Sequence, residues 1–387
     1  MWDALRLILL AASFAFVGAG SGLTVPAGFE IFTVAALPGA RELAALPNGD
    51  LIAGSTGADV YLVRGAESGA AATVSVLAHL PDARASGVAY SQKRHELFVG
   101  TENAVYAATY APGAERLHGD PAAVTRVRTG GIPAGSDGDV HLTTSVAFDD
   151  ASDTLYVSVG SSCNACTEID GTRASIFAMR PDGSDKRKIA KRIRNAIALA
   201  IDPQTHALWA GDAGQDDLPF GHPYDFLDNV SSHHGVADYG WPDCEENRHP
   251  YVSGASCGGT VAPLVELPPY ATIVGATFYP RAPNGRFAFP QTYRGGLFAT
   301  AHGSWHRTNL GAYATAPMVA FVAMRDGSPA TPVNWNDPHA QWTAFVSGFQ
   351  SAFGRSGRPT GIAVGSEGSL FVADAAAGVI YRVRPKQ

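Results

Sequence analysis

The chain has 387 residues, of which 46% are hydrophobic, and it contains 43 glycines and 25 prolines. This length is sufficient for a large core, but so many turn-forming residues disfavour a mostly helical fold, so an all-β class is the first expectation. The formal net charge of −7 at pH 7 gives no basic footprint for nucleic acid and excludes that class of partner.

Residues 1–22 have the pattern of a secretory signal peptide. Arg6 lies in a short N-terminal region, an apolar stretch covers residues 7–17, and small residues cover positions 18–22. The apolar stretch is short for a bilayer span and no second span follows, so cleavage after export is preferred over a membrane anchor. We therefore expect a single mature domain over residues 23–387, located in the periplasm or secreted, with no stable membrane insertion after cleavage.

Four cysteines in a chain that is expected to be exported favour disulfides. Cys163 and Cys166 could instead form a metal knuckle, a redox pair or half of a c-type haem motif. Thr167 stands where haem attachment needs a histidine, and Cys244 and Cys257 are not the close pair that a zinc site needs. We therefore expect one local bridge between Cys163 and Cys166 and a second between Cys244 and Cys257.

A hairpin pattern recurs six times along the chain. Each copy has a strand with alternating apolar residues, a turn of Pro, Asn, Asp or Gly, and a second strand that often ends in Gly. The copies are ELAALPNGDLIAGS from Glu42, SGVAYSQKRHELFVGT from Ser86, TSVAFDDASDTLYVSVGS from Thr144, AIALAIDPQTHALWAGDAG from Ala196, GATFYPRAPNGRFAFPQTYRGGLFATAHGS from Gly275 and TGIAVGSEGSLFVADAAAGVIYRV from Thr360.

A third strand follows several copies, as in DVYLVR, AVYAATY, SIFAMR and VIYRVR, which matches the meander of a propeller blade. One hairpin cannot bury both of its faces, and radial stacking closes the array without long open edges. The sequence therefore predicts an all-β, six-bladed β-propeller of four-stranded antiparallel blades, with an early strand near Glu30 completing the last blade. Residues 216–269 and 307–358 are expected to be insertions on the ring.

Short polar motifs stand at fixed places along these repeats. They are HxxxxVAF at residues 141–148, RN at 194–195, DAGQDDLP at 212–219, YGWPDC at 239–244, YRGGLFATAHGSWHR at 293–307 and GRPTGIAV at 357–364. Together they resemble the soluble aldose and sorbosone dehydrogenases that depend on pyrroloquinoline quinone (PQQ), over nearly the whole mature chain. The resemblance implies a six-bladed propeller with PQQ at its central channel. It also implies bound Ca²⁺, a small-molecule sugar substrate and, since no cytochrome motif is present, an external electron acceptor.

The resemblance assigns a general base. In that family a histidine at the position of His141 takes the proton from the sugar hydroxyl as hydride moves to the quinone. A neutral imidazole suits this role because its unperturbed pKa lies close to working pH. Val140 stands where the family often has an acid, and Asp139 lies one position away. On the residues alone, the alternative is a structural histidine at the end of a strand, with its hydrogen bonds made to neighbouring groups.

The resemblance also assigns the cofactor contacts. Arg194, Asn195 and Arg358 match the family's cofactor positions, and a planar guanidinium can bind a carboxylate of the quinone with two parallel hydrogen bonds. The alternative is that Arg194 belongs to a solvent-exposed run of basic residues, since several lysines and arginines precede it. Related glucose dehydrogenases have a lysine on the fifth blade; here Trp305 or Arg307 would take that contact.

The DAGQDDLP segment resembles the loop whose two backbone carbonyls bind Ca²⁺ in that family. Aligned on this loop, Ala213 and Gly214 would offer the carbonyls, and the ion would act as a Lewis acid on the quinone oxygens. The alternative is an ordinary acidic turn.

The sequence thus predicts an exported quinoprotein dehydrogenase that oxidises an aldose or a sorbosone-like sugar aldehyde. The main alternative is a calcium-dependent propeller hydrolase of the lactonase type, with metal-bound water held by inward carboxylates, because a propeller fold does not decide the chemistry. A third class, a propeller that only binds partners, would leave His141 and the arginines without a common task. One histidine with several arginines favours the first.

Overall fold

The computed structural model describes residues 22–68, 71–126, 141–218, 221–304, 315–337, 339–352 and 354–387. Nearly all of the expected signal peptide lies outside these residues, as do Asp139 and Val140 and the two suggested cofactor residues Trp305 and Arg307. The predictions for those positions stay predictions.

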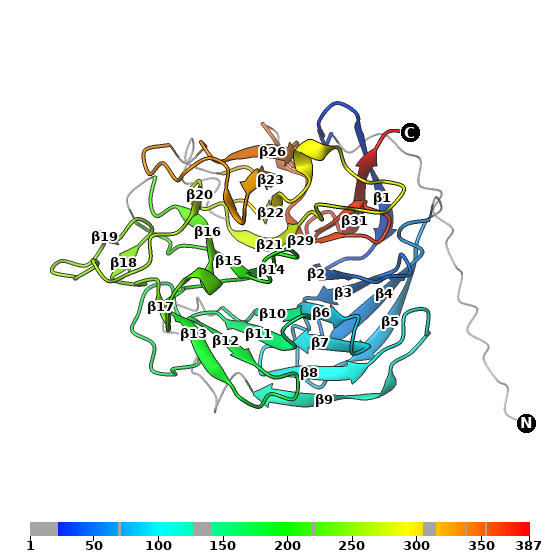
Figure 1. Cartoon of the computed structure of the whole chain (residues 1–387), viewed down its shortest axis with the longest axis horizontal. Coiled ribbons are helices and arrows are strands. Elements are labelled where there is room, and N and C mark those ends of the chain that lie inside the picture. Colours follow the sequence, from blue (N-terminus) through cyan, green and yellow to red (C-terminus); the bar gives the residue numbers. More distant parts are fainter. Residues whose placement is uncertain are drawn as a thin grey trace, which may run out of the picture.

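Six sheets surround one central axis, so the prediction of a six-bladed, all-β propeller is confirmed (Figure 1). Blade 1 contains β2 (Ala40–Ala45), β3 (Leu51–Ser55), β4 (Asp59–Arg64) and β5 (Thr73–His79). Blade 2 contains β6 (Gly87–Ser91), β7 (Glu96–Gly100), β8 (Ala104–Thr109) and β9 (His118–Arg126). Blade 3 contains β10 (Thr144–Asp149), β11 (Thr154–Val159), β12 (Ser175–Met179) and β13 (Arg187–Lys191), extended by the parallel two-residue strand β17 (Ala237–Asp238).

Blade 4 contains β14 (Ala198–Ile201), β15 (Leu208–Asp212), β16 (Asp225–Asn229) and β20 (Val265–Leu267). Blade 5 contains β21 (Ile273–Phe278), β22 (Leu297–Ala301), β23 (Met318–Val322) and β26 (Trp342–Val346). Blade 6 contains β29 (Pro359–Val364), β30 (Leu370–Asp374), β31 (Val379–Pro385) and the N-terminal strand β1 (Phe29–Ala36). The predicted closure of the last blade by a strand near Glu30 is confirmed, since β1 pairs antiparallel with β31.

The prediction that residues 216–269 and 307–358 are insertions is wrong in part. The first segment supplies β16 and β20 of blade 4, and the second supplies β23 and β26 of blade 5. Long connections between the outer strands of these two blades widen the spacing of the repeat, and this spacing was misread as whole insertions.

Short elements decorate these connections. They are the pairs β18 (Cys244–Glu245) with β19 (His249–Pro250), β24 (Met324–Arg325) with β25 (Ser328–Pro329) and β27 (Gln350–Ser351) with β28 (Gly354–Arg355), and the 3₁₀ turns η1 (Val230–Ser232) and η2 (Gln291–Tyr293). In the described part of the chain, no helix has the length and apolar character that a membrane crossing requires.

The innermost strands of the six blades meet around a channel. Three successive residues from each of β2, β6, β10, β14, β21 and β29 line a cavity of about 340 Å³, and most of these residues are apolar. The blades approach closely at its rim because small residues stand there. A Cβ added at Gly87 would lie 2.4 Å from the carbonyl oxygen of Thr144, and one added at Gly361 would lie 2.2 Å from that of Arg41.

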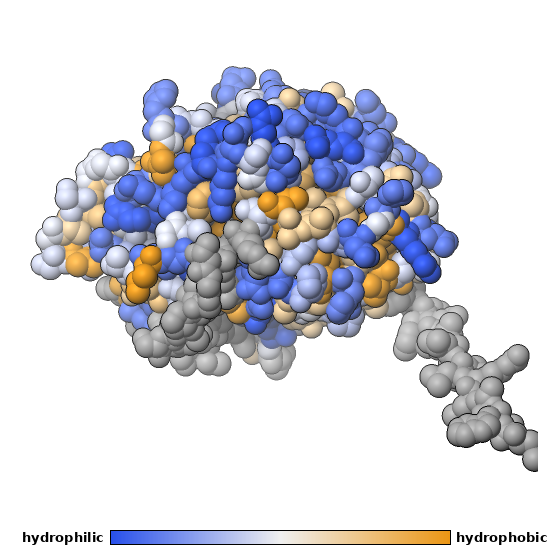
Figure 2. All heavy atoms as spheres, turned by 90° about the horizontal axis from the view of Figure 1, so that it is seen from below, coloured by the Kyte–Doolittle hydropathy of each residue, from blue (hydrophilic) through white to orange (hydrophobic). Residues whose placement is uncertain are grey.

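Hydrophobic side chains fill the spaces between adjacent blades. One cluster joins blades 4 and 5 around the fully buried Trp209, and another joins blades 5 and 6 around Phe289, Phe298 and Phe345. On the face shown in Figure 2, hydrophilic residues cover much of the surface, and hydrophobic residues lie between them. The blades therefore bury their apolar faces mainly against one another.

Candidate active site

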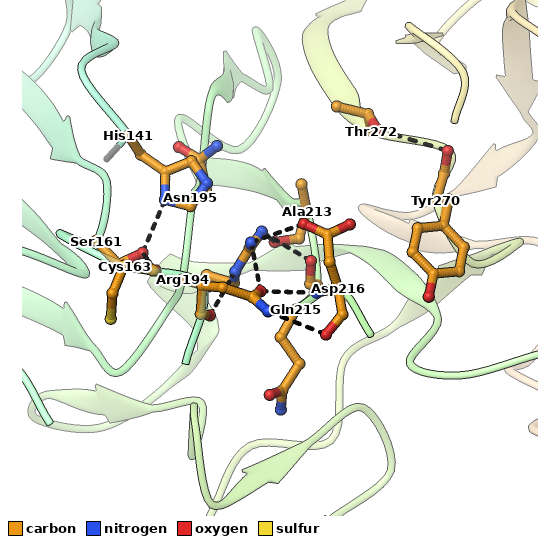
Figure 3. Close-up of polar contacts among 12 residues, drawn as sticks. His141, Ser161, Cys163, Arg194, Asn195, Ala213, Gln215, Asp216, Tyr270 and Thr272 are labelled. Carbon is orange, nitrogen blue, oxygen red and sulfur yellow. Dashed lines mark hydrogen bonds and ion pairs between the residues drawn. The ribbon is translucent and has the colours of Figure 1, made fainter. Parts of the chain in front are cut away.

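The predicted site residues come from turns at one end of the channel. His141 precedes β10, Arg194 and Asn195 precede β14, and Arg358 precedes β29, and all three strands are innermost strands of their blades. Because every blade repeats the same up-and-down order, these strands start at the same end of the axis. The antiparallel strand β15 returns to that end and delivers the loop that starts at Ala213. Figure 3 shows His141, Arg194, Asn195 and this loop side by side.

The hydrogen bonds of His141 determine which ring nitrogen carries the proton. Its Nδ1 lies 2.8 Å from the hydroxyl oxygen of Ser161, and that hydroxyl donates to the carbonyl oxygen of Cys163 at 2.7 Å. A serine hydroxyl has a single hydrogen, so Nδ1–H of the neutral ring must donate to Ser161. Nε2 then carries the lone pair and is the nitrogen that can accept a proton.

Burial and nearby cations keep this ring neutral. Burial lowers the pKa of His141 well below its usual value, and the positive charges of Arg194 and Arg173 lower it further, against a smaller opposing effect of Ser161. Arg173 is itself fixed by the backbone, since its Nη1 donates to the carbonyl oxygens of His141, Gly160 and Ser161 at 3.1, 2.9 and 3.1 Å. The histidine therefore stays in its basic form across the neutral pH range.

Arg194 is 3% exposed and directs all five of its N–H donors to protein acceptors. Nε donates to the carbonyl oxygen of Asn164 at 2.9 Å, and Nη2 donates to Asn164 Oδ1 at 2.8 Å and to Asp216 Oδ2 at 3.1 Å. Nη1 donates to the carbonyl oxygens of Ala213 and Gly214 at 3.2 and 2.8 Å. A bidentate bond from Arg194 to a cofactor carboxylate would therefore require some of these contacts to open.

Asn195 lies beside the histidine. A Cβ built on Gly160 would lie 2.5 Å from His141 Cβ and 2.7 Å from Asn195 Oδ1, so both side chains use the space that this glycine leaves. The backbone N–H of Asn195 donates to Asp212 Oδ1 at 2.6 Å, which fixes the turn into β14. The structure thus brings His141, Arg194 and Asn195 together at the channel end.

The carbonyls of Ala213 and Gly214 converge on one positive group. Behind the loop, the N–H of Gly214 donates to Asp225 Oδ1 at 2.9 Å and that of Gln215 approaches Glu245 Oε2 at 3.4 Å. With their amides turned that way, the two peptide units face their carbonyl oxygens toward Arg194 Nη1. Two converging carbonyl oxygens fit a cation such as Ca²⁺, and here the guanidinium of Arg194 fills that role.

Buried carboxyls surround this loop. Burial raises the pKa of Asp212 to about 7 and that of Asp225 to about 8, and it raises the pKa of Glu245 well above its usual value. For Asp212 and Glu245 the positive charge of Arg194 opposes this rise. A cation at the carbonyls of Ala213 and Gly214 would likewise lower the pKa of these carboxyls.

Arg358 belongs to a second, cationic group on blades 6 and 1. Its Nε and Nη2 donate to the carbonyl oxygens of His302 and Gly303 at 3.1 and 2.8 Å. Burial lowers its pKa to about 10, and repulsion from Arg355 and Arg41 contributes to the decrease. Burial, followed by Arg358 and Arg41, also lowers the pKa of His302 to about 3. Partly desolvated guanidinium groups that repel one another fit a ligand with several negative charges, such as the carboxylates of PQQ.

Sequence reasoning missed several members of both groups. Arg41 and Arg355 stand one residue before the first repeat and three residues before Arg358, so their positions relative to the motifs were a usable signal. Ser161 and Asn164 directly follow a strand of the third repeat, but loop serines and asparagines are too common for residue type alone to indicate a site.

Both predicted disulfides are confirmed: Cys163 is bonded to Cys166, and Cys244 to Cys257. Within the described ranges, only Cys163, Cys166 and Glu168 form a group of three potential metal-ligating side chains, and its two cysteines are joined to each other. The two cysteines of this group are therefore bonded to each other and do not form the metal knuckle that the sequence left open.

Comparison with known proteins agrees with this architecture. A family model described as TrAA12-like matches residues 23–250. An uncharacterised protein of Borreliella burgdorferi is 24% identical over 251 residues, which are 64% of this chain; the match spans only 62% of that protein's length.

Two solved structures share the fold. The calcium structure of a carbohydrate-active enzyme of family AA12 from Trichoderma reesei is 18% identical, with a TM-score of 0.75 and coverage of 95% of this chain and 98% of its own. The holo form of the PQQ domain of pyranose dehydrogenase from Coprinopsis cinerea is 16% identical, with a TM-score of 0.74 and coverage of 94% and 97%. The resemblance to PQQ-dependent sugar dehydrogenases, which the motifs predicted, holds for the fold over nearly the whole described chain.

Proposed function

Because the chain belongs to the TrAA12-like family, and because a neutral histidine lies at the channel end with groups suited to an anionic cofactor, we propose that it is a quinoprotein oxidoreductase. Its substrate is a small sugar, an aldose or a sorbosone-like sugar aldehyde, and its cofactor is PQQ. The observation that carries the proposal is the partly buried, neutral His141, whose Nδ1–H is committed to Ser161 and whose Nε2 can therefore accept a proton.

His141 acts as the general base on a substrate hydroxyl. Nε2 takes the hydroxyl proton while Ser161 and the Cys163 carbonyl keep the ring in the required tautomer and orientation. When bound, PQQ supplies the acceptor for the hydride that leaves the same carbon. An imidazolium beside Arg194 and Arg173 is unfavourable, so the histidine holds the proton more readily when a polyanion lies nearby.

Two groups of residues would hold the cofactor. Arg358, with Arg355 and Arg41, would bind its carboxylates, because these guanidinium groups already repel one another. Asn195, which lies beside His141, would donate a hydrogen bond to the cofactor. Ala213 and Gly214 would give their carbonyls to Ca²⁺, which polarises the quinone oxygens when it is bound. Arg194 Nη1 must then leave these carbonyls, and its donors become available to the cofactor. Trp305 and Arg307 are proposed as further contacts from the fifth blade.

The location and the electron acceptor are parts of the same proposal. The N-terminal pattern of residues 1–22 together with two disulfides supports export to the periplasm or the medium. The mature domain would then begin at residue 23, and electrons would pass from the reduced cofactor to an external acceptor.

The experiment compares the parent protein with His141→Ala after addition of PQQ and Ca²⁺. The parent should oxidise aldoses with a redox dye, and His141→Ala should lose ~10²–10⁴-fold in rate because the general base is gone. PQQ affinity should change little, since the arginines that hold it remain; Arg358→Ala should instead weaken affinity. Equal sugar oxidation by His141→Ala and parent, both with bound PQQ, would contradict the assignment. Hydrolysis of lactones without PQQ would support the hydrolase alternative.

A further inference from the structure

The two-residue loop enclosed by the Cys163–Cys166 disulfide contacts both Arg194 and the loop after β15. Its residue Asn164 accepts from Arg194 twice, through the carbonyl oxygen at 2.9 Å and through Oδ1 at 2.8 Å. Asn164 also bonds Asp216 twice, accepting from its N–H at 2.8 Å and donating from Nδ2 to its carbonyl at 3.1 Å. One side chain on blade 3 thus holds both the guanidinium of Arg194 and the loop after β15 on blade 4.

The flanking residues of the loop extend this role to the histidine. The carbonyl of Cys163 accepts the hydroxyl hydrogen of Ser161, which directs Nδ1–H of His141 to that serine. The indole N–H of Trp241 donates to the Asn164 carbonyl at 3.0 Å, and the same buried tryptophan packs against Cys163. The disulfide closes this small ring of residues, so the orientation of Asn164 depends on its being intact.

We propose that Asn164, held by the Cys163–Cys166 disulfide, is a positioning residue that orients Arg194 and the carbonyls of Ala213 and Gly214. This inference rests on the proposed function, because it concerns the same site. Asn164 acts through Arg194 and the loop that starts at Ala213. Without its Oδ1, Arg194 Nη2 and the N–H of Asp216 both lose an acceptor, which weakens the tie between blade 3 and the loop that presents the two carbonyls.

The first test needs no cofactor. Hydrogen–deuterium exchange of the full chain is compared for the parent, Asn164→Ala and the control Asn48→Ala, whose asparagine also bonds an aspartate, Asp50, but in a turn of blade 1. Peptides covering residues 213–217 should exchange about tenfold faster in Asn164→Ala, because the charge-assisted contacts of Arg194 and the loop are lost. The control should match the parent there. Parent-like exchange over residues 213–217 in Asn164→Ala overturns the proposal.

The second test separates positioning from general stability. Asn164→Asp keeps an acceptor for Arg194 and for the Asp216 N–H but loses the donor to the Asp216 carbonyl, so exchange over residues 213–217 should rise less than in Asn164→Ala. Its negative charge, however, neutralises Arg194, so PQQ affinity should fall about tenfold at an unchanged melting temperature. If Asn164 had only a structural role, PQQ affinity would fall in each variant only as far as its melting temperature falls. That result would overturn the proposal.

The disulfide is tested with the double variant Cys163→Ser/Cys166→Ser, which should show the same faster exchange over residues 213–217 as Asn164→Ala. If this variant does not fold, Asn164→Ala, which keeps both cysteines, still decides the role of the asparagine. If the parent protein fails to bind PQQ, the proposed function fails, whereas the exchange comparison still confirms or overturns the role of Asn164.

Discussion

Glu42 stands where the first blade meets the axis of the channel, in a layer to which the other blades contribute small residues. By position in the repeat, these are Gly87, Ser145, Ala198, Gly275 and Gly361. The hydroxyl of Ser145 on blade 3 donates to Glu42 Oε1 at 2.6 Å, so this carboxyl reaches across the space that Gly87 leaves on blade 2. Burial raises the pKa of Glu42 to about 8, against the opposing effects of Ser145 and Arg41.

This shift predicts how Glu42→Gln changes the pH dependence of stability. The folded-state pKa of about 8 lies above the ordinary value of 4.5, so the folded protein binds more protons than the unfolded chain between these pH values. Stability from this group is therefore complete below pH 4.5 and is lost as pH rises toward 8. Glutamine mimics the protonated form and keeps the acceptor for Ser145. The variant should lose less free energy of unfolding over this window, by up to about 1.4 kcal/mol per pH unit.

Urea unfolding at pH 5, 6.5 and 8 measures the difference between Glu42→Gln and the parent protein. Asp212 and Asp225, whose raised pKa values act in the same direction, are present in both proteins, so the difference reports Glu42 alone. Parallel stability curves for the two proteins would show that the carboxyl is ionised in the folded state at these pH values.

At this scale, sequence reasoning could find residues whose chemistry is rare but not the residues that orient them. His141, Arg194 and Asn195 could be named because a motif gave each one a position relative to a strand; the structure brings them together at the channel end, and their roles stay predictions. Ser161 and Asn164 were missed because their contacts are made across two blades and through a disulfide-closed loop. Such contacts depend on the packed ring and have no local periodic pattern.

In the innermost strands, a glycine near the start of the repeat allows neighbouring blades to approach closely. Gly361 begins the apolar part of β29, and a Cβ there would lie 2.2 Å from the carbonyl oxygen of Arg41 on β2. That acceptor is backbone of the neighbouring blade, so it cannot turn away as a side chain would. The glycine sets how closely blades 6 and 1 approach.

We expect Gly361→Ala to destabilise the protein by about 1–3 kcal/mol, because the added methyl group forces two blades apart. Gly171→Ala is the matched control: nothing lies within 4 Å of a Cβ built there. Chemical denaturation of both variants gives the comparison. Equal stability of the two variants would mean that the inner strands adjust to the methyl group without cost.

The sequence predicted these hairpins well because alternation and turn residues are local signals, as in β10 and β11, which pair in register from Thr144 with Val159 to Asp149 with Thr154. It misread the outer strands of blades 4 and 5. Strands such as β20 (Val265–Leu267) have only three residues and follow long connections, so little alternation remains to be recognised.

For the molecule as a whole, one pairing joins the two ends of the described chain and closes the ring. Strand β1 runs antiparallel to β31, with Phe29 opposite Pro385 and Ala36 opposite Val379. Phe29 is buried, and its ring lies 4.7 Å from that of Phe289, 5.2 Å from that of Phe345 and 5.4 Å from that of Tyr293, centroid to centroid. The N-terminal strand is thus anchored in the core between blades 5 and 6.

Phe29→Ala should therefore cost about 3–5 kcal/mol of stability, the loss of a large buried side chain at the position that closes the ring. The neighbouring Glu30→Ala removes an ion pair with Arg384, 2.6 Å long and partly exposed, and should cost at most about 1 kcal/mol. Urea unfolding followed by tryptophan fluorescence measures both variants. Because β29, which follows Arg358, belongs to the blade that β1 completes, Phe29→Ala should also weaken PQQ binding at temperatures where Glu30→Ala still binds normally. A Phe29→Ala protein as stable as Glu30→Ala would show that the contacts between the blades hold the ring closed without this side chain.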